Sequence, residues 1–413
     1  MKVEIISIGD ELLIGQTVNT NASWMGERLL DINCPVQWIT TIGDEKDHLL
    51  NALAIAEERA ETVLITGGLG PTHDDITKKV VCQYFDSNLV EDKDVLKSIK
   101  ERFAKRNVEM ARVNEEQAMV PEDAEILDND EGTAPGFLFK KEGKRFFILP
   151  GVPQEMKSMM LRHVLPGLEE ILSTGVVKNR ILCTTGIPES TLYSKLDDLE
   201  DLEKDAKLAF LPNYLGVRIR ITAVADDKEQ AKQKLDAVEK RIRDKVDRYI
   251  YADRDILLEE ALHDLLIDKD LTVAVAESCT GGLIADKLTN VSGSSKYFDR
   301  GVVSYSNGSK QDNLGVSEAL LQKHGAVSEP VAAAMAEGVR ELSDTDFGIS
   351  TTGIAGPTGG SREKPVGLVY IAIADEQGTR VEKHIFPNDR RGNKVRAAQA
   401  ALDILRRRIK GLL

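Results

Sequence analysis

Short apolar segments alternate with helical segments over much of the chain, and this order constrains the fold more than any other feature. Residues 3–8 (VEIISI), 62–66 (TVLIT) and 271–276 (LTVAVA) are short runs rich in β-branched residues, as in buried parallel strands. Helical stretches of about ten to fifteen residues are expected between such strands. Strands that alternate with helices form βαβ units, so the pattern predicts α/β domains built on parallel sheets.

An interruption of this pattern near residue 174 divides the chain of 413 residues into three predicted domains. Residues 1–173 are expected to form a three-layer α/β domain on a parallel sheet, and residues 253–413 a second α/β domain. Between them, residues 174–252 include an alternating strand, 216–224 (GVRIRITAV). That alternation predicts a small α+β domain whose sheet has one solvated face.

Composition excludes several classes of protein. The net charge is −14 and only 5% of residues are aromatic, so neither an extended basic footprint nor a stacking surface for nucleic acid is expected. The four cysteines lie far apart without a CxxC pair, which argues against a disulfide framework or a thiolate zinc site. No apolar run approaches 18 residues, so no membrane partner is expected and a cytoplasmic location is predicted.

Polar loops follow the predicted strands of the first domain, and the longest is TGGLGPTHDD, residues 66–75. Consecutive glycines can turn backbone N–H groups toward a phosphate, whereas two aspartates would repel it unless a cation lies between them. We therefore expect a site for phosphate and a divalent metal. The expected metal ligands are Asp10, Asp44, Asp74 and Asp75; the expected substrate-binding residues are Gly67, Gly68, Gly70, Thr72, Pro150 and Gly151. The alternative is that Asp74 or Asp75 only caps a helix.

A possible nucleophile lies where strand 271–276 runs into ESCTGG, residues 277–282. A nucleophile on a strand-to-helix turn is exposed, and N–H groups at the start of the helix can bind an oxyanion. Ser278 and Cys279 are the two alternatives. A cysteine mechanism requires a histidine, and the histidines of this domain lie in no recognisable catalytic surroundings, so Cys279 is expected to be a buried small hydrophobe.

Ser278 needs a base, and Lys310 is the candidate because a desolvated lysine can lose its proton. A solvated surface lysine is the alternative. Arg390 and Arg391 open the last helix and offer guanidinium groups for a phosphate. The other expected residues are Tyr305 and Thr352 for catalysis, and Cys279, Thr280, Gly281, Gly282, Gly353 and Gly356 for substrate binding. This set predicts metal-independent acyl chemistry, such as amide hydrolysis, on a small phosphorylated substrate.

Two further features have simple interpretations. TGGLGPT at 66–72 and TGIAGPT at 352–358 match at five of seven positions, which we interpret as two sites with the same backbone requirement. The last helix ends in arginines and a lysine, residues 406–410, which are expected to be cations favoured at a helix C-terminus; a patch for nucleic acid or lipid is the alternative.

The loops of the first domain resemble a known family. GDELLIGQTVNTN, TGGLGPTHDD, GTAPGF and LPGVPQEM are similar, in order and spacing, to the MoaB/Mog-like molybdopterin-binding domain at the N-terminus of the CinA family. The resemblance implies hydrolysis of ADP-ribose with a divalent metal such as Mg, Mn or Co.

The last domain resembles the CinA C-terminal domain, a nicotinamide-nucleotide amidase. The matching segments are AESCTGGLIADKLTNVSGSS, YSNGSK, HGAVSEP, TTGIAGPTGGSREKPVG and NDRR. The resemblance implies hydrolysis of the carboxamide of nicotinamide mononucleotide (NMN) without a cofactor. The family's serine, tyrosine, lysine, threonine and arginine correspond to Ser278, Tyr305, Lys310, Thr352 and Arg390. This chain has PNDRR where many relatives have a glycine before Asp-Arg, which leaves open whether Arg390 or Arg391 holds the phosphate.

The middle domain lies where this family has a KH-like linker, but it lacks the GxxG clamp for nucleic acid. We interpret it as a spacer or as a dimerisation unit of a homodimer. The resulting hypothesis is an enzyme with two active sites, for NMN and ADP-ribose. One alternative is an amidase whose N-terminal domain only binds nucleotides, and another is an accessory protein of DNA uptake.

Overall fold

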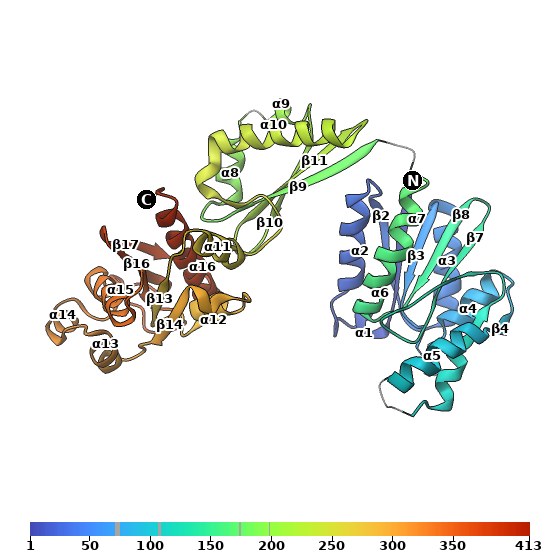
Figure 1. Ribbon diagram of the computed structural model, residues 1–413, viewed down its shortest axis with the longest axis horizontal. Coiled ribbons are helices and arrows are strands. Elements are labelled where there is room, and N and C mark those ends of the chain that lie inside the picture. Colours follow the sequence, from blue (N-terminus) through green and yellow to red (C-terminus); the bar gives the residue numbers. More distant parts are fainter. Residues whose placement is uncertain (71–74, 106–108, 173–174, 198) are drawn as a thin grey trace. The chain divides into compact units, whose positions relative to one another are not determined.

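The computed structural model describes residues 1–70, 75–105, 109–172, 175–197 and 199–413 (Figure 1). Internal contacts divide the chain into two compact units: Met1–Val177 with Ala225–Asp227, and Lys178–Val224 with Lys228–Leu413. The larger sheets have six, four and five strands. They confirm the predicted α/β class with a small α+β domain between two larger domains. No helix in the described ranges is long and apolar enough to cross a membrane.

The first sheet has the strand order β2-β1-β3-β8-β7-β6. The first four strands are parallel and the last two are antiparallel to their neighbours. The strands are β1 (Val3–Ile8), β2 (Val36–Ile42), β3 (Thr62–Thr66), β6 (Glu125–Leu127), β7 (Gly136–Lys141) and β8 (Lys144–Leu149). The apolar run 146–149 (FFIL) predicts β8, and the parallel sheet is extended beyond it by β7 and β6, which the apolar pattern did not predict.

Helices cover both faces of this sheet, as three layers require (Figure 1). One face packs against α2 (Thr20–Asp31), α6 (Pro153–Met159) and α7 (Leu165–Glu169). A π-helical turn, Met160–Val164, joins α6 to α7. The other face packs against α3 (Lys46–Arg59) and α4 (Thr77–Tyr84). Residues of β1 alternate between the two cores. The remaining elements are α1 (Asp10–Leu13), β4 (Leu89–Glu91), α5 (Lys93–Lys105), a 3-10 helix (Arg112–Ala118) and β5 (Met119–Pro121).

The middle domain is a four-stranded sheet, β10-β11-β9-β12, with helices on one face. Its elements are β9 (Val176–Thr184), α8 (Glu189–Lys195), α9 (Leu199–Leu202), β10 (Lys207–Pro212), β11 (Val217–Ala225), α10 (Lys228–Val246), a 3-10 turn (Asp247–Tyr249) and β12 (Ile250–Ala252). Val217, Ile219 and Ile221 are buried against the helices, whereas Arg218 and Arg220 are partly exposed. The predicted alternation of β11 is confirmed.

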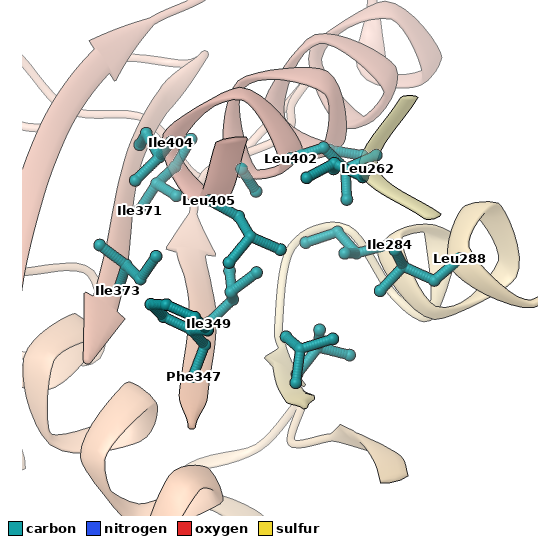
Figure 2. Close-up of a cluster of buried hydrophobic side chains, with 14 of the residues drawn as sticks. Leu262, Ile284, Leu288, Phe347, Ile349, Ile371, Ile373, Leu402, Ile404 and Leu405 are labelled. Atoms are coloured by element: carbon teal, nitrogen blue, oxygen red, sulfur yellow. The ribbon is translucent and has the colours of Figure 1, made fainter. Parts of the chain in front are cut away.

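The C-terminal sheet has the order β14-β13-β15-β16-β17, and its first three strands are parallel. The strands are β13 (Val273–Glu277), β14 (Phe298–Val303), β15 (Phe347–Gly353), β16 (Leu368–Asp375) and β17 (Gly378–Ile385). Helices α11 (Leu258–Asp268), α12 (Leu283–Thr289) and α16 (Arg390–Ile409) cover one face and α15 (Glu329–Ser343) the other. Figure 2 shows Ile349 of β15 and Ile371 of β16 in the same apolar cluster as Leu405 of α16. A 3-10 turn (Ser294–Lys296), α13 (Asn307–Leu314) and α14 (Glu318–His324) complete the domain.

Candidate active sites

A serine and a buried lysine meet at the carboxyl end of the C-terminal sheet. Lys310 lies on α13, whose first turn is capped by the Ser306 side chain. Its Nζ is 3.1 Å from Ser278 Oγ and 2.7 Å from the carbonyl oxygen of Ser304. The lysine is 1% exposed, and burial lowers its pKa below the ordinary lysine value. Lys310 is therefore buried against the serine, and the alternative of a solvated surface lysine is wrong.

The turn that carries Ser278 is held in place by Glu277, to which the sequence analysis gave no role. The buried Glu277 carboxylate accepts hydrogen bonds from the backbone N–H groups of Gly282, Ile284 and Ala285, at 2.8 to 3.1 Å. Those groups at the start of α12 are thus not open to an oxyanion. Only the N–H groups that precede them in the turn remain candidates. The sequence signal that could have identified Glu277 is an acidic residue directly before a glycine-rich turn that leads into a helix.

Glycine is required twice in this turn. Gly281 and Gly282 have φ of 62° and 93°, in the left-handed region. A Cβ on Gly281 would also lie 3.4 Å from Nζ of Lys394, a half-buried residue of α16. The turn therefore lies beside an ammonium group.

Cys279 has the properties expected of a core residue. It is 6% exposed, and burial raises the pKa of its thiol to about 12. The thiolate is the nucleophilic form of cysteine, and a thiol with such a pKa is protonated at neutral pH. The prediction that Cys279 is a buried small hydrophobe is confirmed.

The threonine at the turn is Thr351 rather than Thr352. The hydroxyl groups of Thr351 and the buried Thr280 are 2.7 Å apart, and Thr351 also accepts a backbone hydrogen bond from Ser278. The Thr352 hydroxyl instead donates to the carbonyl oxygen of Ala326 at 2.7 Å. Successive residues of a strand face opposite sides of its sheet, so only one of the two can reach the turn. Thr352 therefore has an anchoring contact with Ala326, and its expected catalytic role stays a prediction.

Arg390 joins two other expected residues. Its guanidinium group donates to the carbonyl oxygen of Gly356 at 2.7 Å and to the Tyr305 hydroxyl at 2.9 Å. Tyr305 is 62% exposed and follows Ser304, the residue whose carbonyl contacts Lys310. Arg391, the alternative phosphate ligand, is exposed. Gly353 lies in β15 paired with Val369 and packs against β16 rather than facing a ligand.

Carboxylates gather at the carboxyl end of the N-terminal sheet. Asp10 and Asp44 exchange backbone-to-side-chain hydrogen bonds of 3.1 and 3.3 Å. Burial, followed by repulsion from the neighbouring carboxylates of Asp10, Glu11 and Asp75, raises the pKa of Asp44. The N-cap position of α4 belongs to Ile76, so Asp75 does not occupy it.

These residues fit a hard cation in donor type and charge, because a cation would offset their mutual repulsion. Within the described ranges, however, no three His, Cys, Asp or Glu side chains are close enough together to hold one ion. Asp74 and Thr72 lie outside the described residues.

A cavity of about 330 Å³ lies beside Asp75. It is lined by Gly68, Gly70, Asp75, Pro150, Gly151 and residues of the GTAPGF segment. Gln117 also lines it; this residue is 4% exposed, and its Oε1 has no hydrogen-bond partner among the described residues. Gln117 was missed because nothing in its sequence neighbourhood marks a site.

The two similar glycine-rich loops do not share one backbone conformation, and that interpretation is wrong. In the first loop Gly67 and Gly68 have φ of 117° and 64°. In the second, Gly356 has φ of 86°, while Gly353, which corresponds to Gly67, still belongs to strand β15.

Two α/β domains joined by a KH-like domain, one with a serine–lysine pair and one with a carboxylate-lined cavity, define a class of multidomain protein. Family models agree with this class. The "Probable molybdopterin binding domain" matches residues 4–170, the "Damage-inducible protein CinA KH domain" residues 179–252, and the "CinA C-terminal domain" residues 256–409.

Whole-chain relatives match over the full length. A "CinA-like protein" of Salinibacter ruber is 46% identical over 409 residues, which cover 98% of this chain and 99% of that protein. A "CinA-like protein" of Kosmotoga olearia is 42% identical over 413 residues and all of both chains. The crystal structure of "competence/damage inducible protein CihA" from Agrobacterium tumefaciens is 42% identical and covers 37% of this chain and 95% of that one, with a TM-score of 0.35. The chain belongs to the CinA family.

Proposed function

We propose that the C-terminal domain hydrolyses the carboxamide of NMN to nicotinate mononucleotide and ammonia. The observation that carries this proposal is the 3.1 Å contact between Lys310 Nζ and Ser278 Oγ, with the lysine buried and its pKa lowered. A neutral lysine beside a serine hydroxyl is a nucleophile with its base. No metal ion is needed for these steps.

The steps balance as follows. Neutral Lys310 takes the hydroxyl proton as Ser278 Oγ forms a bond to the carboxamide carbon, whose oxygen becomes an oxyanion. Lys310 then returns the proton to the nitrogen, the carbon–nitrogen bond breaks and ammonia leaves an ester on Ser278. Water adds to that ester in the same way and releases the nicotinate carboxylate. Lys394 beside the Gly281 turn adds positive charge near the oxyanion.

Arg390 has the position to bind the phosphate of the substrate. It lies in the first turn of α16, and the N-terminal end of a helix favours an anion. Tyr305 and Gly356 fix the guanidinium through the two hydrogen bonds described above. A substrate held there would extend from α16 toward Ser278.

A second activity is favoured by the N-terminal cavity and its carboxylates. We propose that this domain hydrolyses ADP-ribose to AMP and ribose 5-phosphate. A divalent ion such as Mg²⁺, Mn²⁺ or Co²⁺ would be held by Asp10, Asp44, Asp74 and Asp75 and would neutralise the diphosphate. Gly68 and Gly70 line the cavity where a phosphate could approach the backbone, and Gln117 offers an acceptor to a hydroxyl or amino group of the ligand.

One experiment tests both activities. The purified protein is incubated with NMN and with ADP-ribose, each with and without a chelator, and the products are identified. Nicotinate mononucleotide with ammonia supports the first proposal, and AMP with ribose 5-phosphate supports the second. A protein that leaves NMN intact in all conditions contradicts the first.

A further inference from the structure

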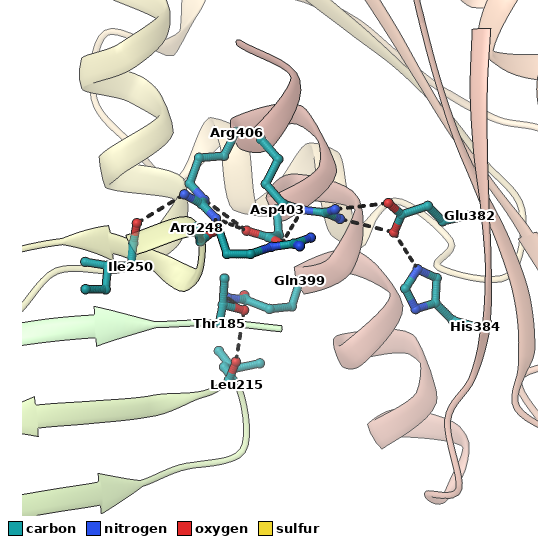
Figure 3. A network of polar contacts seen from close by, with 10 residues as sticks. Thr185, Leu215, Arg248, Ile250, Glu382, His384, Gln399, Asp403 and Arg406 are labelled. Carbon is teal, nitrogen blue, oxygen red and sulfur yellow. Dashed lines mark hydrogen bonds and ion pairs between the residues drawn. The ribbon is translucent and has the colours of Figure 1, made fainter. Parts of the chain in front are cut away.

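The KH-like domain is hydrogen-bonded to helix α16 near the C-terminal end of that helix. Arg406 is 1% exposed and donates hydrogen bonds to the carbonyl oxygens of Ile250 and Arg248, at 3.1 and 2.6 Å. Its Nε donates to Asp403 at 2.9 Å (Figure 3). A buried guanidinium is tolerated only when its N–H groups are paired, so this contact needs both domains in place. Arg406 thus connects the KH-like domain to the C-terminal domain, in addition to being a cation at a helix C-terminus.

A second contact lies further toward the start of the helix. Gln399 Nε2 donates to the Thr185 hydroxyl at 3.4 Å, and that hydroxyl donates to the carbonyl oxygen of Leu215 at 3.3 Å (Figure 3). Leu215 belongs to the loop between β10 and β11. Asn213 orders this loop, because its side chain accepts hydrogen bonds from two backbone N–H groups within it.

Tyr214, at the tip of this loop, reaches the first turn of α16. The guanidinium carbon of Arg396 lies 5.6 Å from the centroid of its ring, a cation–π arrangement. A Cβ on Gly392 would lie 1.9 Å from the Tyr214 hydroxyl oxygen. The phenol therefore packs directly on the backbone of the helix, which is possible because residue 392 has no side chain.

The turn under Tyr214 is the turn that holds Arg390. Gly392 donates its N–H to Asp389 at 2.7 Å, so the cap of the helix and the tyrosine meet at one residue. Gly392, Arg396, Gln399, Asp403 and Arg406 are spaced three or four residues apart and form one stripe along α16. This stripe faces the KH-like domain, whereas Arg390 bonds Tyr305 and Gly356 in the C-terminal domain.

We propose that Tyr214 is a positioning residue of the amidase site: by packing on Gly392 and Arg396 it holds the first turn of α16, and with it Arg390, in the geometry that binds the substrate phosphate. The KH-like domain is then part of the amidase rather than a spacer. This inference rests on the proposed amidase function. Within the described residues Tyr214 contacts Gly392 and Arg396 of α16 rather than Ser278 or Lys310, so its effect is on binding.

Kinetics of full-length variants test the proposal. Tyr214→Ala is expected to raise the KM for NMN about tenfold, as for partial loss of one charge-assisted contact, with kcat changed less than about twofold. Tyr214→Phe keeps the ring beside Arg396 but loses the hydroxyl that lies against Gly392, so its KM is expected to lie between those of the wild type and Tyr214→Ala. Tyr193→Ala is the matched control, since Tyr193 is an exposed tyrosine of the same domain whose ring contacts Phe210. A Tyr214→Ala variant with the KM of the control overturns the proposal.

Hydrogen exchange gives a second measurement that does not depend on amidase activity. Tyr214→Ala should speed amide exchange in residues 389–394 relative to Tyr193→Ala, and Tyr214→Phe should speed it less. If the wild-type protein leaves NMN intact, the proposed function fails while the exchange still decides whether Tyr214 holds this turn. Exchange equal to that of the control overturns the proposal.

Discussion

The two candidate sites occupy the same place in their domains but are built from opposite charges. Each lies at the carboxyl ends of parallel strands, where polar loops converge. In the N-terminal domain the carboxylates of Asp10 and Asp75 repel that of Asp44, and Asp75 also lines a cavity. In the C-terminal domain Lys310 is buried against a serine hydroxyl. Similar sheet topology therefore determines where the site lies in each domain, and the local charge decides which chemistry is available there.

The glycine-rich loops of the two sites show how similar sequences acquire different conformations. Thr66 and Thr352 anchor their loops in the same way, by donating to the carbonyl oxygens of Pro150 and Ala326. Beyond the threonine the backbones diverge. Strand β3 ends at Thr66, whereas β15 continues through Gly353 because the antiparallel β16 pairs with it there. The neighbouring strand, rather than the loop sequence, sets the position of the turn.

Removing the nucleophile should have the largest effect. Ser278→Ala is expected to lower ammonia release from NMN by about a thousandfold or more, because no group replaces the attacking oxygen. Cys279→Ala is the adjacent control and should stay within about threefold, since its thiol is protonated at neutral pH. An inactive Cys279→Ala beside an active Ser278→Ala would assign the chemistry to the cysteine.

Removing the base should lower kcat by about a hundredfold or more and change the pH profile. In the proposed mechanism the base is the neutral form of Lys310, so the rate should rise as pH rises through the lysine pKa and level off above it. Because burial lowers that pKa, the rate should rise at a pH below the ordinary pKa range of lysine. Lys310→Met should lose this limb of the kcat profile, and a limb retained in the variant would exclude Lys310 as the base.

Chelation should separate the two sites. A chelator is expected to lower ADP-ribose hydrolysis by about a hundredfold, because the metal supplies several kcal/mol of charge stabilisation, and to leave NMN hydrolysis unchanged. Asp44→Asn and Asp75→Asn should reproduce this separation without chelator. If a chelator lowered NMN hydrolysis as well, the proposed difference in metal dependence between the two sites would be wrong.

Arg390→Ala should weaken NMN use by about ten- to hundredfold, mainly in KM, as expected for one lost charge-assisted contact. Nicotinamide riboside, which lacks the phosphate, should be a poor substrate that the variant hardly affects. Equal losses on both substrates would give Arg390 a structural role. The phosphate would then be sought at Arg391 or Lys394.

The smallest expected effect concerns the first glycine-rich loop. Gly68→Ala should lower the free energy of unfolding of its domain by about 2 kcal/mol, measured by denaturant titration, because a Cβ there meets Thr77 Oγ1 and φ is positive. Gly143→Ala is the control for φ alone: it has φ of 80° but open space, and should cost about 1 kcal/mol. Equal losses would mean that the close contact with Thr77 is unimportant.

The sequence alone determined most elements and the segments that carry the sites. Strands such as Val3–Ile8 and Thr62–Thr66 matched their predicted ranges because burial on both faces selects continuous apolar runs. The ESCTGG turn was identifiable because a nucleophile, glycines and a helix start are adjacent in the chain. The run FFIL likewise predicts β8, whereas its hairpin partner β7 was missed because neither apolar alternation nor a βα pattern marks it.

Tertiary structure alone decided which candidates act together. Lys310 reaches Ser278 across 32 residues of sequence, and the strand register selects Thr351 over Thr352 for the turn. Tyr214 reaches α16 from another domain, and Gln117 is set apart only by its unpaired, buried oxygen. The physical reason is that burial and hydrogen-bond partners are properties of neighbours in space, and those neighbours are assembled from segments that the sequence keeps far apart.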